Sequence, residues 1–212
     1  MTDTPFVFEP GGFLLVVSGP SGAGKGTLVE RLLRTCGYCT FSVSATTRAR
    51  RTNESEGVQY EFVSREEFDR RRDQGLFLEW AEVHGHLYGT PAAPADAGVR
   101  AGHVVVLDVD VQGGASVRVA RPEAVSVFVL PPTIDTLRER LSTRATDTAD
   151  TVARRLAAAP NELAQYREYD YAIVNDDLDR AAARLIAIVE AERARVRRLR
   201  ERREPLPTRS AS

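Results

Sequence analysis

One stretch, from residue 13 to residue 27, constrains the fold of this chain more than any other. It begins with an unbroken apolar run at 13–17, which is typical of a strand buried on both faces, as in a parallel sheet. The sequence GPSGAGKGT follows, and then Leu28, Val29, Leu32 and Leu33 recur at helical spacing. Strand, glycine-rich loop and helix in this order predict a phosphate site, because glycines let backbone N–H groups approach a polyphosphate and the helix N-terminus adds further donors.

The loop carries the only lysine of the chain, Lys25, although the chain has 29 lysine and arginine residues in total. This choice indicates a site that needs a compact ammonium group rather than a planar guanidinium. The general phosphate-loop pattern has Ser or Thr directly after the lysine to hold magnesium, whereas here Gly26 intervenes before Thr27. Gly-Lys-Gly-Thr resembles the loop of nucleoside monophosphate kinases. The phosphate-binding candidates are Gly19, Pro20, Ser21, Gly22, Ala23, Gly24, Lys25, Gly26 and Thr27, and Thr27 is also the candidate metal ligand.

Composition excludes several classes of function. The chain has 212 residues, 42% hydrophobic and 28% charged, which suits one α/β domain with insertions. Its net charge of -1 gives no overall field that attracts nucleic acid or a membrane surface. The sequence has no apolar run near the ~20 residues of a membrane span and no basic and apolar leader at its start. We therefore expect a cytoplasmic protein with no nucleic-acid or membrane partner.

Cys36 and Cys39 form a C-x-x-C pair. Such a pair can be a redox centre, or half of a zinc site that needs two further ligands. The three histidines offer no H-x3-5-H partner. We favour two incidental thiols in the loop after the first helix.

The order of the predicted elements indicates an α/β fold with one insertion. Strands are expected at 40–45, 58–63, 76–83 and 86–91, with a polar helix at 65–75 that carries Phe68. Residues 42–91 are thus predicted to form a small, mostly β insertion. The core, residues 13–41, 92–132 and 170–203, is predicted to be a three-layer phosphate-loop fold, with a parallel sheet flanked by helices.

The second half of the chain is predicted to supply the remaining core strands and a helical lid at 133–169. A strand at 104–110 ends in Asp108 and Asp110, which would share one face because strand periodicity is two. Two further strands are expected at 125–130 and 171–176, and helices at 134–144, 150–169 and 178–204. In the helix at 150–169, Asp150 is the expected N-cap and Pro160 is expected to cause a kink or a restart. The arginine-rich end of the helix at 178–204 is expected to be a solvated face, and the tail at 205–212 to be disordered.

Three clusters of polar and charged residues indicate which ligands the site would bind. The first is a basic loop with neighbouring hydroxyls, in which arginine forks and a phenol suit a monophosphate dianion. Its members are Ser44, Arg48, Arg51 and Tyr60. The competing interpretation, which we favour less, is a solvated basic loop.

The second cluster surrounds Glu79, which lies in an apolar strand and needs a partner if it is buried. A carboxylate accepts from the two donors on the Watson–Crick edge of guanine, and a hydroxyl such as that of Thr90 can serve O6. Adenine would present an acceptor instead. The competing interpretation is a glutamate at an exposed strand position.

The third cluster is Arg140, Arg144 and Arg155, on helices that flank a polar loop. Such a loop could close arginines onto transferring phosphates, although arginines on helices are usually surface residues.

Together these motifs resemble guanylate kinase over most of the chain, from about residue 14 to residue 185. The matching segments read SGPSGAGKGT, SVSATTR, EG-x-x-Y-x-F, FLEWAEVHGHLYGT, VVLDVDVQG, FVLPP and YDYAIVNDDLD. The resemblance implies transfer of the terminal phosphoryl group of ATP to GMP with Mg²⁺, in guanine nucleotide synthesis, by a monomer or homodimer.

The resemblance also implies residue roles. The GMP pocket would comprise Ser44, Arg48, Arg51, Tyr60, Glu79, Tyr88, Thr90, Asp108 and Asp110. ATP would bind the loop from Gly19 to Thr27, with Asn175 near adenine. Lys25, Arg48, Arg140, Arg144 and Arg155 would be catalytic.

The chain departs from the family pattern in three places, one of which is Pro160, within a helix that is usually uninterrupted. The family loop Arg-x-Pro-Arg-Pro-Gly-Glu appears here at 48–54 without either proline and with Asn53 in place of glycine, and Ala145 follows the lid arginine where glycine is usual. Two other functions stay open: a kinase of ribose 1,5-bisphosphate, against which the base-reading Glu79 argues, and a phosphopeptide-binding scaffold, which has no need of Lys25 and the lid arginines.

Overall fold

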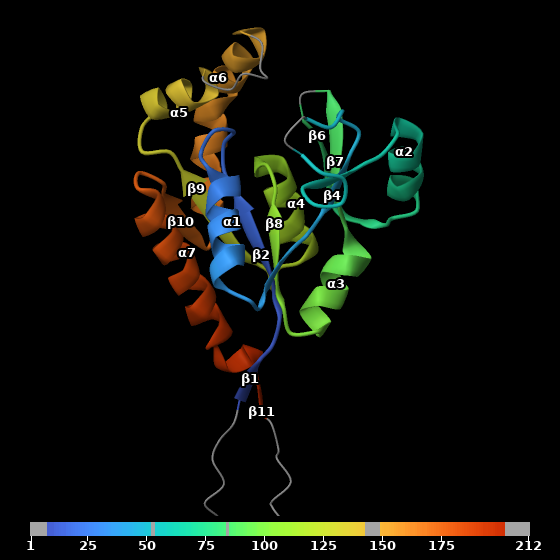
Figure 1. Cartoon of the computed structure of the whole chain (residues 1–212), viewed down its shortest axis with the longest axis vertical. Coiled ribbons are helices and arrows are strands. Elements are labelled where there is room, and N and C mark those ends of the chain that lie inside the picture. The colour runs from blue at the N-terminus through green and yellow to red at the C-terminus, as the bar shows by residue number, and fades with distance from the viewer. Residues whose placement is uncertain (1–7, 52–53, 84, 143–148, 202–212) are drawn as a thin grey trace, which may run out of the picture.

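The computed structural model describes residues 8–51, 54–83, 85–142 and 149–201, and of residues 149–151 only the backbone. Thr52, Asn53, Arg144, Ala145 and the tail at 205–212 lie outside the described residues. The α/β class expected from the sequence is confirmed, because a parallel sheet lies between two helical layers (Figure 1).

The central sheet has five parallel strands in the order β10-β9-β2-β8-β3. Their bounds are Tyr171–Val174 (β10), Val125–Leu130 (β9), Phe13–Ser18 (β2), Val104–Asp108 (β8) and Cys39–Phe41 (β3). Every residue of β2 is buried, as its unbroken apolar run predicts for a central parallel strand. The phosphate loop leaves the carboxyl end of β2, which is the edge where ligands bind in open parallel sheets.

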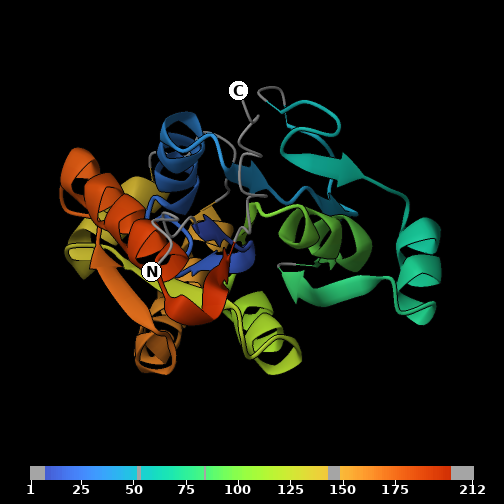
Figure 2. The same cartoon turned by 90° about the horizontal axis from the view of Figure 1, so that it is seen from below.

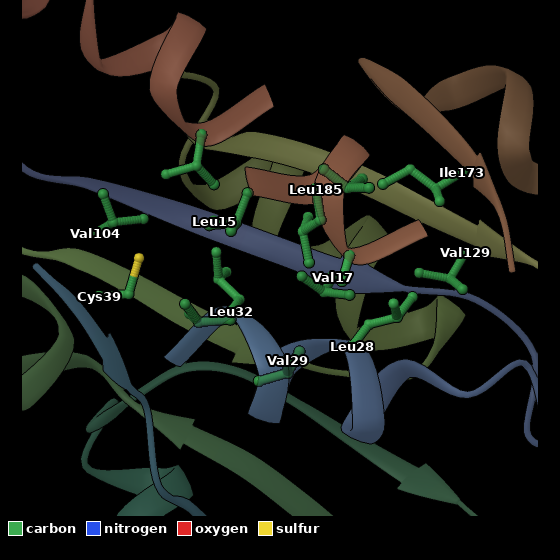
Figure 3. Packing of buried hydrophobic residues seen from close by; sticks show 14 of the residues in the cluster. Leu15, Val17, Leu28, Val29, Leu32, Cys39, Val104, Val129, Ile173 and Leu185 are labelled. Carbon is green, nitrogen blue, oxygen red and sulfur yellow. The ribbon is translucent and has the colours of Figure 1, made fainter. Parts of the chain in front are cut away.

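Alternate residues of β2 build the two halves of the core. Leu15 and Val17 face the helices α1 and α7, while Leu14 and Val16 face α3 and α4. These helices span Lys25–Thr35 (α1), Leu178–Arg193 (α7), Ala92–Arg100 (α3) and Val111–Ala120 (α4). Figure 3 shows the first half, where β2 packs against side chains labelled Leu28, Val29 and Leu32 from α1 and Leu185 from α7.

A second, four-stranded sheet lies to one side of the core (Figure 2). Its order is β5-β4-β7-β6, with bounds Tyr60–Phe62 (β5), Ser44–Thr46 (β4), His86–Pro91 (β7) and Phe77–Val83 (β6). The helix α2, Arg65–Asp73, covers it through Phe68, whose ring stacks on that of Phe77 at 4.6 Å. Two further helices, α5 (Ile134–Ser142) and α6 (Ala149–Ala164), pack on each other through Leu137, Leu141 and Ala159, and the 3-10 turn η1, Gln165–Glu168, follows α6.

Two of the predicted strands are wrong in instructive ways. The single strand expected at 40–45 is two strands, β3 and β4, in different sheets, because alternation does not reveal which partner a strand pairs with. The strand expected at 104–110 ends at Asp108, and Asp110 is instead the N-cap of α4, accepting from Gly113 N at 2.9 Å. Neither α3 nor α4 was expected.

The helix α6 continues through Pro160, so the predicted restart there is wrong. Proline removes one helical hydrogen bond and usually breaks a helix. Here the packing of the neighbouring Ala159 against α5 holds the helix together.

The last predicted helix is too long. It ends at Arg193, and the chain continues as a 3-10 turn, Val196–Arg198 (η2), and a strand, Leu199–Glu201 (β11), that pairs antiparallel with Phe8–Pro10 (β1). The reason is a buried anion: Glu192 is 2% exposed, forms ion pairs with Arg195 and Arg198, and accepts a hydrogen bond from the Tyr171 hydroxyl. This contact turns the chain back, so the arginine-rich end is not the solvated helical face that propensity suggested.

Cys36 and Cys39 are free and buried in the core cluster. Across the described ranges, no group of three or more His, Cys, Asp or Glu side chains is placed to hold a metal ion. None of the described helices combines the length and the apolar character needed to cross a membrane.

Candidate active site

A cavity of about 510 Å³ lies between the carboxyl edge of the central sheet and the second sheet. It brings together most of the predicted site residues from segments far apart in the sequence. Those lining it are Gly19, Ser21, Gly22, Gly24, Lys25, Gly26, Thr27, Ser44, Arg48, Arg51, Tyr60, Glu79, Tyr88, Asp108, Asp110 and Arg155. Pro20, Ala23, Thr90, Arg140 and Asn175 lie behind the lining, and Arg144 is outside the described residues.

The phosphate loop has the backbone that its glycines predict. Gly19, Gly22 and Gly24 all have positive φ, and a Cβ on Gly19 would lie 2.3 Å from Val129 O. The helix α1 begins at Lys25 with no side chain capping its first turn. Its first N–H groups are therefore available to an anion. Lys25 Nζ folds back over the loop and donates to Gly19 O at 2.8 Å.

Residues from three other segments hold this loop in place. Asn175, which follows β10, donates from Nδ2 to Ala23 O at 2.8 Å. Arg140 of α5 donates to Ala23 O and to Asn175 O at 3.3 and 3.1 Å. Arg155 of α6 donates to Ser21 Oγ at 3.1 Å. Two of the three predicted lid arginines thus contact the phosphate loop or its support.

At the other end of the cavity, Glu79 is a buried carboxylate, 7% exposed. Glu79 of β6 and Thr90 of β7 are paired across the antiparallel strands, and Thr90 Oγ1 donates to Glu79 Oε1 at 2.6 Å. The hydroxyls of Thr90 and Ser44 are 3.3 Å apart. Burial raises the pKa of Glu79 to about 7; the bonds from Thr90 oppose the rise and the charge of Asp110 adds to it. A buried acceptor with two hydroxyls beside it can read the donors of a ligand edge.

A glycine of α4 completes this end. A Cβ placed on Gly113 would lie 2.8 Å from Glu79 Oε2 and 3.2 Å from Asp110 Oδ1. A side chain at this position would therefore displace the Glu79 carboxylate, and glycine lets α4 approach it this closely.

Arg48 lies between the two ends, in the loop after β4. Its Nε donates to Tyr88 Oη at 3.1 Å, and its guanidinium carbon lies 5.4 Å from the centre of the Tyr60 ring. It also forms a two-bond ion pair with Glu54, at 2.8 and 3.0 Å. The sequence placed Arg48, Arg51 and Tyr60 together, and all three line the cavity.

Sequence reasoning missed Gln112 and Glu162, which also line the cavity. Glu162 is seven residues after Arg155 on α6, about two helical turns, so the same face carries both. Burial raises the pKa of Glu162, and the charge of Lys25 opposes that rise. The spacing of seven from a predicted lid arginine was the signal that could have found it.

The fold and the site together define a class. A phosphate loop after the central strand, with arginines reaching it from two helices and a second polar pocket opposite, is the arrangement of a P-loop kinase with a small acceptor. Within that class, the family model for guanylate kinase matches residues 12–192. This chain belongs to the guanylate kinase family.

Individual relatives agree over nearly the whole chain. A guanylate kinase of Symbiobacterium thermophilum is 51% identical over 187 residues, covering 88% of this chain and 89% of that protein. One of Chelativorans sp. is 50% identical over 185 residues, covering 87% and 85%. The crystal structure of guanylate kinase from Anaplasma phagocytophilum superposes with a TM-score of 0.78 at 35% identity, covering 91% and 92% of the two chains.

Proposed function

We propose that this chain transfers the γ-phosphoryl group of ATP to the phosphate of GMP, giving ADP and GDP. One observation carries the proposal: a single cavity has the phosphate loop at one end and the buried Glu79 carboxylate at the other, with Arg48 and Arg51 between them. This order matches a donor triphosphate, an acceptor phosphate and a guanine base laid end to end. The family membership supports the same reaction.

In this proposal, the acceptor end reads base and phosphate separately. Glu79 accepts from the guanine edge, while Ser44 and Thr90 complete the polar set around the base, with Asp110 nearby. Arg48, Arg51, Tyr60 and Tyr88 bind the GMP phosphate. That phosphate is already anionic, so its attack on ATP needs no general base.

The donor end works by positioning and charge. The loop N–H groups and Lys25 bind the ATP phosphates, and Asn175 lies near adenine. Arg140 and Arg155, on the helices that we propose form the lid, neutralise charge on the transferring group. We propose that residues 42–91 and 133–169 act as the acceptor-binding insertion and the lid.

The residues beside the loop fit Mg²⁺. Thr27 and Asp108 are oxygen donors that line the cavity, and a Cβ on Gly26 would lie 3.6 Å from Asp108 Oδ2. A site with one carboxylate and one hydroxyl is suited to Mg²⁺, because this cation usually takes its other ligands from phosphate and water oxygens. When bound with ATP, Mg²⁺ would neutralise charge at the phosphates.

The test is an ADP-release assay with Mg-ATP and a panel of acceptors: GMP, dGMP, AMP, UMP, CMP and ribose 1,5-bisphosphate. We expect strong turnover with GMP, with dGMP equal or trailing, and background rates with the rest. Turnover with the sugar bisphosphate alone would overturn the role of Glu79. Tight GMP binding without turnover would indicate a binding module instead of a kinase.

A further inference from the structure

The described residues include a buried acid that the proposed reaction does not use. Three glutamates among the described residues are buried, namely Glu79, Glu192 and Glu54, and Glu54 lies in the loop between β4 and β5. Glu79 lies at the base end of the cavity, and Glu192 binds Arg195, Arg198 and Tyr171. Glu54 is not among the residues that line the cavity, and its carboxylate is bound by Arg48 and by the Arg51 N–H. Its contacts point to an indirect role.

Both carboxylate oxygens of Glu54 bind one guanidinium. Arg48 Nη2 donates to Oε1 at 2.8 Å and Arg48 Nη1 donates to Oε2 at 3.0 Å. The two side chains are 11% and 10% exposed, so water does not screen the pair as it would at the surface. Two parallel bonds fix the plane of a guanidinium as well as its place.

The fixed guanidinium in turn orients a hydroxyl. Arg48 Nε donates to Tyr88 Oη at 3.1 Å, so that oxygen is an acceptor towards Arg48 and its own proton must point elsewhere. Tyr88 and Arg48 both line the cavity, and Arg48 packs over the rings of Tyr60 and Phe62 at 5.4 and 5.7 Å. Glu54 therefore acts on the cavity through Arg48 and Tyr88.

Glu54 also closes the loop that carries the second arginine. Its Oε2 accepts from Arg51 N at 2.9 Å, and its own N–H donates to Arg51 O at 3.1 Å. Arg50 adds a third tie, donating from Nη1 to Glu54 O at 2.8 Å. One side chain thus fixes the guanidinium of Arg48 and the backbone of Arg51.

The ionisation states agree with this geometry. Burial alone would raise the pKa of Glu54, but the bonds from Arg48 and from Arg51 N–H outweigh it and the pKa is lowered. Burial works against the charged form of Arg48 too, and the bonds to Glu54 and Tyr88 outweigh it, so its pKa is raised. Both groups are charged at neutral pH.

We propose that Glu54 is a positioning residue for the phosphate of the acceptor: it holds Arg48, and through it the Tyr88 hydroxyl, in the orientation that receives a phosphate monoester. The proposal rests on the proposed function, in which that phosphate belongs to GMP. A carboxylate behind Arg48 also lowers the local positive charge, so positioning and charge act in opposite directions and can be separated by experiment.

The test is Glu54→Gln, which keeps the shape and removes the charge. The variant loses the charge-assisted bonds that hold Arg48 in place for the phosphate of GMP. We therefore expect KM for GMP to rise about tenfold or more. The values of kcat and of KM for ATP should change less than about threefold, because Glu54 contacts neither the phosphate loop nor the lid. In equilibrium titrations the variant should bind GMP more weakly and guanosine, which lacks the phosphate, as well as before.

The chain offers a matched control. Glu61 forms a slightly shorter two-bond pair with Arg71, at 2.7 Å in both bonds. This pair is more exposed than that of Glu54, and it lies on the same small sheet but away from the cavity lining. Glu61→Gln should leave KM for GMP unchanged. This control separates loss of an ion pair in this sheet from loss of the Glu54 contact.

Each other outcome overturns the proposal. An unchanged KM for GMP would remove Glu54 from phosphate binding, and a lowered one would show that it competes with the phosphate for Arg48. Equal weakening of GMP and guanosine, or a matching rise in KM for ATP, would show a general loss of structure. If the wild-type chain does not phosphorylate GMP, the proposed function fails, while the GMP and guanosine titrations still test Glu54.

Discussion

Lowering the pH from 8 to 6 should weaken GMP binding about tenfold through one carboxyl group, that of Glu79. Its pKa is raised to about 7, first by burial, then by the nearby charge of Asp110, against the bonds from Thr90. Guanine presents two donors to this group, so only the carboxylate can accept both. A group with a pKa near 7 is about 90% protonated at pH 6 and about 10% protonated at pH 8, which gives the factor of about ten in KM.

The measurement is KM for GMP across pH 6–8 at saturating ATP. A phosphate monoester also titrates near pH of about 6, so the ligand contributes its own pH dependence. Glu79→Gln is the control, since it keeps that contribution and removes the carboxyl group. We expect a higher KM in this variant, with a shallower pH dependence than the wild type. Parallel pH profiles for the two proteins would refute the reasoning.

The same group links pH to folding. Its pKa in the folded protein, about 7, lies above its usual 4.5, so protonation favours the folded state. This contribution of Glu79 to the free energy of unfolding is fully present below pH of about 4.5 and is lost as the pH rises through about 7. The loss amounts to about 3 kcal/mol. In denaturant titrations at pH 5 and pH 8, the wild type should therefore lose more stability than Glu79→Gln over that interval.

Three more changes should have distinct effects. Lys25→Ala should abolish transfer, because the loop loses its point charge on the phosphates; retention of most of kcat would remove Lys25 from the mechanism. Gly113→Ala should raise KM for GMP at least severalfold, since its Cβ would lie 2.8 Å from Glu79 Oε2, and an unchanged KM would show that α4 can shift. Glu192→Ala should cost about 3–5 kcal/mol in denaturant unfolding because it leaves Arg198 buried without its anion; a loss below about 1 kcal/mol would contradict this.

The sequence predicts the backbone of the glycine-rich loop well because the information for it is local. The residues of the loop and the start of α1 are contiguous, and their geometry follows from glycines and helix periodicity. The same holds for β9, whose bounds match the apolar run at 125–130. Buried parallel strands have a strong signal that does not depend on distant partners.

Prediction from the sequence fails where a contact with a residue distant in the sequence determines the local structure or the role of a side chain. Nothing near Glu192 in the sequence shows that it is buried, so the turn after Arg193 looked like continuing helix. Asp110 was expected to share a strand face with Asp108. Both residues do line the cavity, but Asp110 reaches it as the N-cap of α4 and not as a strand residue. The part played by Glu54 is visible only once its bonds to Arg48 and Arg51 are seen.

The ribbon of β1 and β11 determines how the molecule responds when it is held by its ends. Phe8 lies opposite Glu201, at the end of the molecule away from α5, α6 and the small sheet (Figure 1). Tension applied between these two residues breaks the ribbon's bonds one pair at a time, as in a zipper, because the strands are antiparallel. The opening then meets the bond from Gly11 N to Arg198 O and the buried Glu192. A surface anchor or a fused partner that pulls on Phe8 and Glu201 would therefore load the ribbon before the rest of the fold.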